Sequence, residues 1–445
     1  MKIEPLIYQQ NPQWLSTFYS KPEKDWFTRP EFFRILSFLN KRVAIAVTGL
    51  RRVGKSTLLY QIKYHLEEKI NPKNIFFFSF EKSQVKYETE ILRTILNWYF
   101  ETFLRSPPKF LKEKVYIFLD EIQYIPNWQE VVKTFYDLTP QIKFFLSGST
   151  SLFIKKTAVE SLAGRMIEMT LPPLRFSEFF TLKKNLINKN PKKLYQEHPQ
   201  LLISLFEEYL SIGQFPELIG EKYSQNQAKL YLSSIEEKII EQDIPKTFPV
   251  KRVDILRLIF DFLKKQHSEI FEFSYISNDL GIDLKTTIKY FDFFKKSFLI
   301  DFCLNRTKKL LKSGRVAKKI YLTSTNFSLN TVSKKVENYV FNFFSSSYST
   351  QFFRKKNLEI DFIIKTEIND TLIEVKYKEE LKSDDYKNII KLAKAFKVKT
   401  VYIISKNYLG TIKQDNLTLK IIPVCLLELT SLSSPQISLT DRILF

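Results

Sequence analysis

The chain has 445 residues, of which 44% are hydrophobic and 15% aromatic, so it can bury several cores and is expected to form about three domains. Its net charge of +21 favours a polyanionic partner, most simply nucleic acid, although a Lys-rich, Gly-poor genome composition would have the same effect without any partner. Only two cysteines, no signal-peptide core and no apolar stretch of membrane-spanning length are present, which excludes a disulfide framework, a zinc site and a membrane partner and indicates a cytoplasmic protein.

The first predicted strand, 43–47, leads into a complete phosphate-binding loop pattern, GxxxxGK[ST], over residues 49–57. A helical pattern begins directly after the loop. Strand, glycine loop and helix together direct backbone N–H groups at a phosphate chain, so we predict an ATP site in which Lys55 neutralises the β- and γ-phosphates and Ser56 binds Mg²⁺. The residues predicted to contact the nucleotide here are Gly49, Arg52, Val53, Gly54, Lys55, Ser56 and Thr57.

A second apolar strand, 115–119, ends in Asp120 and Glu121. An acidic pair at the carboxyl end of a buried parallel strand lies where α/β sheets bind ligands. We predict that Asp120 holds Mg²⁺ and that Glu121 polarises the water that attacks the γ-phosphate. A helix that merely begins with two acids is the alternative.

The third strand, 142–146, is followed by four small residues that include Ser149. The Ser149 hydroxyl is a candidate sensor of the γ-phosphate, and a simple turn is the alternative. Further along, Arg165 is the first candidate for the cation that neutralises transition-state charge, within this chain or from a neighbouring copy in a homo-oligomer. Arg51 and Arg52 compete for that role.

The middle of the chain changes character twice. A helical segment follows Pro172 and Pro173, and after a break at Pro249 two helices joined through Gly281 precede a basic, hairpin-like stretch. This order predicts a winged helix in which Asp283 caps the second helix, Thr286 and Thr287 face a groove, and the stretch from Arg306 to Lys319 forms the wing. The alternative is a module that packs on the ATPase or binds protein. The candidate DNA-binding residues are Lys285, Lys289, Lys308, Lys309, Lys312 and Arg315.

The last segment returns to strands mixed with helices. Its predicted strands, 359–364 and 371–376, carry Asp361 on one and Glu374 and Lys376 on the same face of the other. Two carboxylates and an amine suit metal-assisted hydrolysis of a phosphodiester, with Mg²⁺ on Asp361 and Glu374, Lys376 acting on the water, and Glu337 completing the metal shell. A solvated charged strand face is the alternative.

Several of these segments resemble the prokaryotic AAA-type proteins known as archaeal ATPases. The resemblance rests on residues 49–57, 118–123, 162–165, 171–174 and 209–217 and covers nearly the whole chain. It implies a winged helix and a C-terminal restriction-endonuclease-like module, whose PD-(D/E)xK pattern is matched position by position by Glu337, Asp361, Glu374 and Lys376. This chain departs from the family in having Ser56 for threonine and Gly213-Gln214 for a double glycine.

The predicted architecture is therefore α/β in four parts: a P-loop AAA-type core (1–172), a helical lid (173–248), a winged helix (249–324) and a restriction-endonuclease-like domain (325–445). Two functions remain open. The first is an ATP-dependent enzyme acting on DNA, whose nucleotide state gates a Mg²⁺-dependent nuclease. The second is an ATP-dependent switch or scaffold whose nuclease-like module binds DNA or protein without cleaving.

Overall fold

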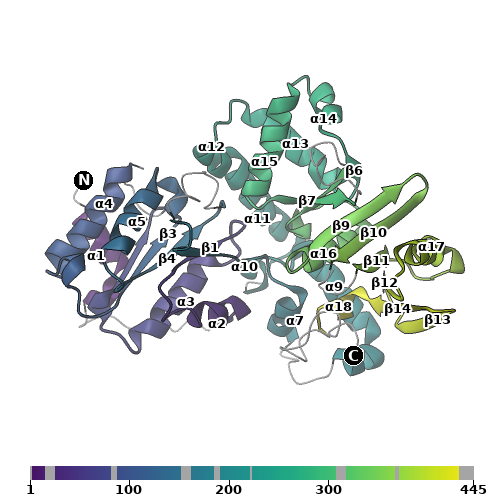
Figure 1. The fold of residues 1–445 in the computed structure, drawn as a ribbon, viewed down its shortest axis with the longest axis horizontal. Helices are drawn as coiled ribbons and strands as arrows, with labels where there is room; N and C mark the ends of the chain where they lie inside the picture. Colours follow the sequence, from purple (N-terminus) through teal and green to yellow (C-terminus); the bar gives the residue numbers. More distant parts are fainter. Residues whose placement is uncertain are drawn as a thin grey trace. The chain divides into compact units, whose positions relative to one another are not determined.

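The computed structural model describes residues 3–15, 26–81, 88–151, 162–184, 191–220, 223–306, 317–365 and 370–429. The chain divides into two compact units (Figure 1). The N-terminal unit comprises Met1–Pro172, Glu241–Val250 and Lys296–Phe298; the C-terminal unit comprises Pro173–Ile240, Lys251–Lys295 and Leu299–Phe445. The predicted boundary at residue 172 therefore coincides with a structural one. The predicted lid, winged helix and last domain instead fall largely within a single unit.

The N-terminal unit is built on a parallel sheet of five strands in the order β2-β3-β4-β1-β5. These strands are β1 (Ala44–Thr48), β2 (Ile75–Ser79), β3 (Val115–Asp120), β4 (Ile142–Gly148) and β5 (Met166–Thr170). Every residue of β1 to β4 is buried, because helices cover both faces of the sheet. The three strands predicted from apolar runs are thus confirmed.

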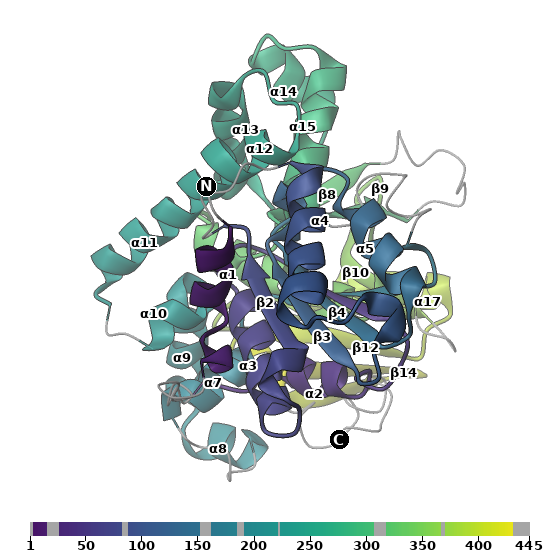
Figure 2. The ribbon, with the colours of Figure 1, turned by 90° about the vertical axis from the view of Figure 1, so that its left-hand side faces the viewer.

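Helices lie on both faces of this sheet (Figure 2). On one face α3 (Lys55–Glu67) packs against β2, β3 and β4; on the other, apolar side chains of α1 (Glu4–Gln10), α4 (Thr89–Asn97) and α5 (Trp128–Leu138) share one core with the sheet. The remaining helical segments are η1 (Pro12–Trp14), α2 (Pro30–Leu36), η2 (Pro72–Asn74), η3 (Trp98–Phe103), η4 (Pro108–Phe110), η5 (Ile122–Tyr124) and α12 (Ile244–Thr247). The three layers hold the carboxyl ends of β1, β3 and β4 at one edge, where the predicted nucleotide site lies.

The C-terminal unit contains one continuous sheet of nine strands in the order β13-β14-β12-β11-β10-β9-β7-β8-β6. Its strands are β6 (Ile270–Phe271), β7 (Ile300–Asn305), β8 (Lys318–Leu322), β9 (Ser349–Lys355), β10 (Leu358–Lys365), β11 (Asp370–Lys376), β12 (Thr400–Ser405), β13 (Gly410–Gln414) and β14 (Leu417–Pro423). β10 and β11 pair antiparallel, which confirms that the two predicted C-terminal strands are neighbours. Because β7 pairs with β8 and with β9, strands from the predicted winged helix and from the predicted last domain share one sheet.

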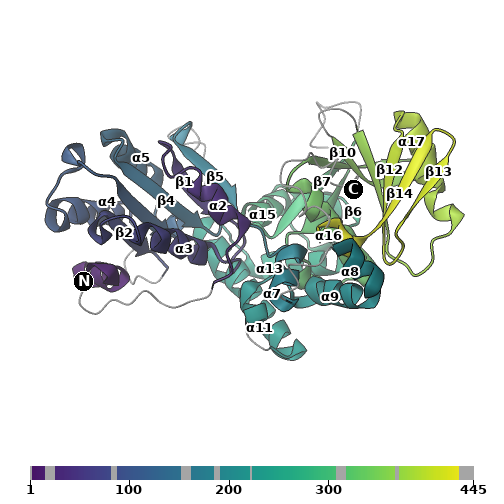
Figure 3. The same cartoon turned by 90° about the horizontal axis from the view of Figure 1, so that it is seen from below.

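The helices of this unit pack on both faces of the sheet (Figure 3). One core joins α9 (Pro199–Ile212) and α16 (Val332–Ser345) to the sheet, and the other joins α17 (Lys387–Phe396) to its opposite face. The other helical segments are α7 (Phe176–Lys184), α8 (Pro191–Glu197), α10 (Pro216–Gly220), α11 (Gln225–Glu237), η6 (Lys238–Asp243), α13 (Val253–Gln266), α14 (Phe273–Asp279), α15 (Leu284–Lys296), η8 (Thr325–Phe327), η9 (Ser383–Tyr386) and α18 (Val424–Leu427). The last three residues of η6 and the last residue of α15 belong to the N-terminal unit. Among the described residues, no helix combines the length and apolar character needed to cross a membrane.

Gln214, where the sequence departs from the family pattern, has a structural role in this unit. Its side-chain oxygen accepts hydrogen bonds from the Ser324 hydroxyl at 2.7 Å and the Thr325 N–H at 2.8 Å. Its amide nitrogen donates to the Thr325 hydroxyl at 2.9 Å. Gln214 therefore joins the end of α9 to η8, a buried connection that a second glycine would lack.

Candidate functional site

The phosphate-binding loop depends on glycine at two positions. Gly49 has φ +143°, and a Cβ atom there would lie 2.3 Å from the carbonyl oxygen of Leu171. Gly54 precedes α3 with φ 98°, a left-handed conformation that costs other residues energy. The loop therefore has the close backbone approach and the helix start that a phosphate-binding loop requires.

Lys55 lies over this loop. Its buried ammonium donates to the carbonyl oxygens of Gly49 at 3.2 Å and Leu50 at 3.1 Å and lies 3.8 Å from a carboxylate oxygen of Glu121. The structure thus brings together the two residues predicted to bind phosphate and to activate water. Val53 and Thr57 flank Gly54 and Ser56 in the same segment, and their contact with nucleotide stays a prediction.

Asp120 is the centre of a group of hydroxyls at the end of β3. The Ser56 hydroxyl lies 3.0 Å from both carboxylate oxygens, the Ser79 hydroxyl donates at 3.1 Å, and the Ser147 hydroxyl also donates. Burial and the neighbouring charge of Glu121 raise the pKa of Asp120, and the three hydroxyl donors oppose that rise. The sequence interpretation missed Ser79 and Ser147, although both lie near the carboxyl ends of strands beside β3, the edge where ligand residues gather.

Glu121 is held in an unusual conformation beside this group. Its φ of 56° is left-handed, and its N–H donates to the Ser147 hydroxyl at 3.0 Å. The Gln123 amide donates to Glu121 at 2.5 Å and to the Ser149 hydroxyl at 3.1 Å, so Gln123 links the predicted catalytic residue to the predicted sensor. The buried Thr150 hydroxyl has no hydrogen-bond partner in the described part of the chain.

The three candidate arginines occupy different places. Arg165 pairs with Asp137 at 2.9 Å just before β5, at the amino ends of the parallel strands, whereas the loop follows their carboxyl ends. About 13 Å of strand separates the two edges, so Arg165 does not reach the nucleotide site of its own chain. Arg51 is buried in ion pairs with Asp243 at 2.9 Å and with Glu81. Arg52 is exposed with φ 67°.

In the C-terminal unit, Asp361, Glu374 and Lys376 lie together as predicted. The Val375 N–H donates to Asp361 at 2.9 Å, and the Lys376 ammonium donates to Glu374 at 2.5 Å. Burial and the charge of Asp361 raise the pKa of Glu374 to about 8, although Lys376 acts in the opposite direction.

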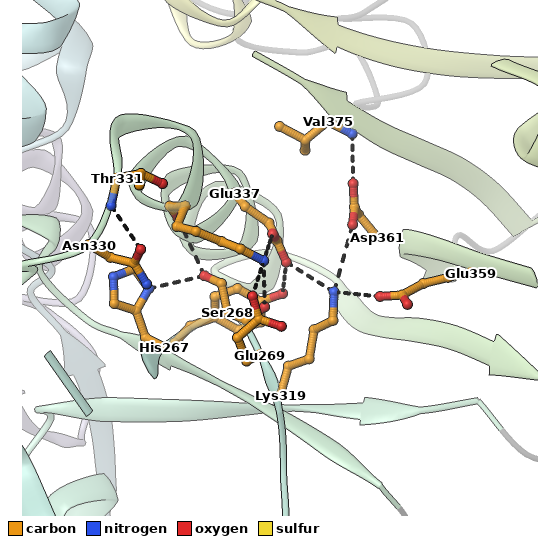
Figure 4. Close-up of polar contacts among 12 residues, drawn as sticks. His267, Ser268, Glu269, Lys319, Asn330, Thr331, Glu337, Glu359, Asp361 and Val375 are labelled. Carbon is orange, nitrogen blue, oxygen red and sulfur yellow. Dashed lines mark hydrogen bonds and ion pairs between the residues drawn. The ribbon is translucent and has the colours of Figure 1, made fainter. Parts of the chain in front are cut away.

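Lys319, which the sequence interpretation assigned to the wing, is the unexpected member of this group. Its ammonium lies 3.0 Å from Glu359, 3.1 Å from Glu337 and 3.7 Å from Asp361 (Figure 4). Burial alone would lower the pKa of Lys319, but the three carboxylates raise it above the ordinary value. The sequence contained a signal for a buried lysine here, because side chains alternate along a strand such as β8 and one of Lys318 and Lys319 must therefore point inward.

The predicted metal shell of Glu337, Asp361 and Glu374 is therefore not formed as expected. Within the described ranges, no group of three or more His, Cys, Asp or Glu side chains has the arrangement of a metal site. Glu337 instead contacts two ammonium groups, that of Lys319 and that of Lys334 at 3.3 Å, and accepts the Tyr321 hydroxyl at 2.8 Å. The physical reason is that a cation from the chain already lies between the carboxylates.

The predicted DNA-binding residues are only partly described. Lys285 and Lys289 are exposed on α15, and the predicted cap is confirmed, since Asp283 accepts the N–H groups of Lys285 at 3.1 Å and Thr286 at 2.8 Å. Thr287 is fully buried, so it does not face a groove. The wing residues Lys308, Lys309, Lys312 and Arg315 lie outside the described residues.

Comparison with known families agrees with the first of these sites. Residues 41–180, which include the whole loop, Asp120 and Glu121, match the AAA domain family. The N-terminal unit contains an AAA-type ATPase domain. Residues 203–329 and 333–427 match two domains of unknown function, DUF8612 and DUF4143. The first of these two matches crosses the predicted boundary between lid and winged helix.

The chain is also similar to curated relatives that are described as uncharacterized. The chain is 29% identical over 277 residues to an uncharacterized protein of Methanocaldococcus jannaschii, covering 59% of this chain but only 56% of that relative. It is 27% identical over 396 residues to a second uncharacterized protein of the same organism, covering 84% of this chain and 81% of the relative. Among solved structures it is similar to a Walker-type ATPase of Pyrococcus abyssi, with a TM-score of 0.43, 17% identity, and coverage of 70% of this chain and 97% of that one.

The ATPase domain also has the chemistry expected of a magnesium site. Ser56 and Asp120 present hard oxygen ligands side by side, 3.0 Å apart. In the described part of the chain, the side-chain partners of the buried Asp120 carboxylate are the neutral hydroxyls of Ser56, Ser79 and Ser147. The Thr150 hydroxyl, which has no hydrogen-bond partner among the described residues, is a further polar group that a ligand could contact. These residues fit the ion that accompanies ATP in P-loop enzymes.

Proposed function

We propose that this protein hydrolyses ATP in its AAA-type domain and uses the nucleotide cycle as a switch for a DNA-binding C-terminal unit. The observation that carries the ATPase part is the convergence of Lys55, Ser56, Asp120 and Glu121 at one edge of the parallel sheet. Ser56 lies 3.0 Å from Asp120, and Lys55 lies 3.8 Å from Glu121. Two groups of the phosphate-binding loop and two carboxylates thus lie close together at this edge. Hydrolysis of the γ-phosphate requires such an arrangement.

The residues divide the chemistry among themselves. Lys55 exchanges the carbonyl oxygens of Gly49 and Leu50 for the β- and γ-phosphates, while the backbone N–H groups of the loop contact the phosphate chain. Ser56 and Asp120 would hold Mg²⁺, which when bound offsets the negative charge that grows on the phosphate oxygens. Glu121 orients the attacking water and accepts its proton, and Gln123 fixes the position of the Glu121 carboxylate.

The DNA part of the proposal is supported by charge and element order. The elements follow one another in the order α13, β6, α14, α15, β7 and β8, the order found in winged helices. Lys285 and Lys289 are exposed on α15, the second helix of the helix pair. Lysines on such a helix release counterions from phosphates on binding, consistent with the net charge of +21.

A nucleotide-gated, metal-dependent nuclease is the second candidate for the C-terminal unit. One observation favours it: Lys376 lies 2.5 Å from Glu374, and Asp361 accepts the Val375 N–H on the adjacent strand. In that case Asp361 and Glu374 would hold the metal, and Lys376 would orient the water. The contacts of Lys319 favour the switch, because they leave the carboxylates of Glu337 and Asp361 already paired.

Two assays test the proposal separately. Phosphate release by wild-type and Lys55→Ala protein tests the ATPase, and equal turnover by the two proteins would contradict the site assignment. Incubation of linear, supercoiled and branched DNA with Mg²⁺ or Mn²⁺, with and without ATP, tests the nuclease. Only cleavage that Asp361→Ala, Glu374→Ala and Lys376→Ala all remove would support the nuclease, because contaminating nucleases are insensitive to these changes.

Homo-oligomerisation is part of the proposal for one geometric reason. Arg165 lies at the opposite edge of the sheet from the loop of its own chain, and its side chain is partly exposed beside Asp137. We therefore propose that Arg165 serves the nucleotide site of a neighbouring copy, in which it would neutralise transition-state charge. ATP turnover that rises with protein concentration in wild-type protein, but not in Arg165→Ala, would support this role.

A further inference from the structure

We infer that Lys319 is the resident cation of the carboxylate cluster in the C-terminal unit and takes the place that a divalent metal would occupy between Glu337 and Asp361. The inference deepens the C-terminal part of the proposed function, on which it rests, and favours a module that binds without cleaving. It does not depend on ATP hydrolysis. The cluster is defined here as Lys319 together with Glu337, Glu359 and Asp361.

The position of Lys319 is the first argument. Glu337 comes from α16, Glu359 and Asp361 come from β10, and Lys319 reaches them from β8 (Figure 4). Its ammonium has three N–H donors and lies 3.1, 3.0 and 3.7 Å from the three carboxylates in that order. One monovalent group thus connects three acids from two elements, as a bridging metal ion would.

Burial makes this arrangement specific. The side chain of Lys319 is only 4% exposed, that of Glu337 9% and that of Asp361 16%. Charges held in so little water are stable only when they are paired, since each loses its hydration on folding. The lysine is therefore a structural requirement of the cluster and not an incidental surface contact.

Among the described residues, each carboxylate oxygen of Glu337 and of Asp361 already has a contact within the chain. The second oxygen of Glu337 contacts Lys334 at 3.3 Å, and the second oxygen of Asp361 accepts the Val375 N–H at 2.9 Å. Glu374, the remaining predicted ligand, pairs with Lys376 at 2.5 Å. A divalent ion binds carboxylate oxygens at roughly 2.0–2.6 Å, so an ion shared by Glu337 and Asp361 would meet the Lys319 ammonium at close range. Repulsion between the two cations prevents both from occupying the cluster.

Metal binding by the nucleotide-free 445-residue chain tests the inference. Mn²⁺ is titrated into wild type, Lys319→Met and the matched control Lys318→Met, and binding is followed by electron paramagnetic resonance and calorimetric transition temperature. Each protein is also compared with its Asp361→Asn derivative, which separates this cluster from the ATPase site. Lys318 adjoins Lys319 on the same strand and lies 4.5 Å from the ring of Phe273, so Lys318→Met removes an equal charge outside the cluster.

The expected result is specific to Lys319. Wild type and Lys318→Met should show no Asp361-dependent Mn²⁺ binding. Lys319→Met should gain one Asp361-dependent Mn²⁺ site that binds at least tenfold more tightly than any site at Asp361 in wild type. The same variant should have a lower transition temperature than wild type and recover it when Mn²⁺ is added. Asp361-dependent binding in wild type would overturn the inference, as would a folded Lys319→Met that gains no site. Should Lys319→Met fail to fold, the wild-type comparison with Asp361→Asn alone decides. ATP turnover, measured in parallel, shows separately whether the proposed ATPase function fails.

Discussion

The guanidinium of Arg51, in the phosphate-binding loop, lies 2.9 Å from the carboxylate of Asp243, although the two residues are 192 positions apart. The Tyr124 hydroxyl donates to the other Asp243 oxygen at 3.0 Å, and Glu81 pairs with the same guanidinium. The carboxylates hold the pKa of Arg51 above its ordinary value even though burial acts to lower it. The segment that contains Asp243 is therefore an integral part of the ATPase domain.

Asp243→Ala should destabilise the N-terminal unit by about 3 kcal/mol, because it leaves Arg51 buried with a single, more exposed partner. Urea unfolding followed by tryptophan fluorescence measures this effect in the right unit, since all four tryptophans (Trp14, Trp26, Trp98 and Trp128) belong to it. The control is Asp137→Ala, which breaks the partly exposed pair with Arg165 and should cost less than about 1 kcal/mol. Equal effects of the two changes would contradict the structural role of Asp243.

Lys55→Ala should abolish tight ATP binding, whereas Glu121→Gln should retain binding and lower the turnover rate by a factor of about 100 or more. We expect this difference because, in the proposed site, Lys55 would contact charged phosphates in the ground state, while Glu121 would act on the attacking water. Binding of a fluorescent ATP analogue and phosphate release measure the two effects. Loss of nucleotide binding in Glu121→Gln would show that Glu121 has a different role.

Gln123→Ala should lower turnover about tenfold with little change in ATP affinity. Gln123 orients Glu121 and contacts Ser149 without lying in the phosphate-binding loop, so its loss misaligns the carboxylate but leaves the phosphate contacts intact. The same two assays apply. An equal change in affinity and turnover would indicate that Gln123 contacts the nucleotide directly.

Charge reversal at Lys285 and Lys289 should weaken DNA binding and flatten its dependence on salt, because each lysine that contacts a phosphate releases counterions. The same holds for Lys308, Lys309 and Lys312 on the predicted wing. Fluorescence anisotropy with labelled DNA over a salt series measures both quantities. Reversal of Lys391 and Lys394, exposed on α17, is the control and should leave the salt slope nearly unchanged. Unaltered affinity after reversal at α15 and the wing would make this region a protein-packing module.

Stability of the C-terminal unit should fall between about pH 5 and pH 8 through the titration of Glu374. Its pKa of about 8 in the folded unit exceeds the value of about 4.3 expected in the unfolded chain. The folded state therefore binds this proton more tightly, so the contribution is complete at low pH, is lost as the pH rises toward 8, and changes no further above that.

Glu374→Gln isolates this contribution because the amide stays neutral at every pH. The C-terminal unit contains no tryptophan, so its transition temperature is taken from the calorimetric transition that tryptophan fluorescence does not report. The transition temperature of the variant minus that of wild type should increase as the pH rises. Glu380→Gln, which alters an exposed carboxylate, should keep a constant difference from wild type. A constant difference for Glu374→Gln as well would show that the carboxyl titrates normally.

The sequence by itself determined the ATPase domain. The loop from Gly49 to Thr57 is contiguous, and Asp120 and Glu121 adjoin each other at the end of an apolar strand, so local spacing alone predicts which groups would face the phosphates. Asp361, Glu374 and Lys376 were predictable in the same way, because strand alternation and a short connection place them together.

Only the tertiary structure decided the contacts between distant segments. Strand direction within the sheet separates Arg165 from the loop of its own chain, and the return of residues 241–250 brings Asp243 to Arg51. The ion-pair partners of the C-terminal carboxylates also depend on tertiary structure, because Lys319 on β8 and Glu337 on α16 lie beside Asp361 on β10. Local sequence patterns predict which side chains share a face. The cation that neutralises a buried carboxylate, however, depends on packing between elements that are far apart in the sequence.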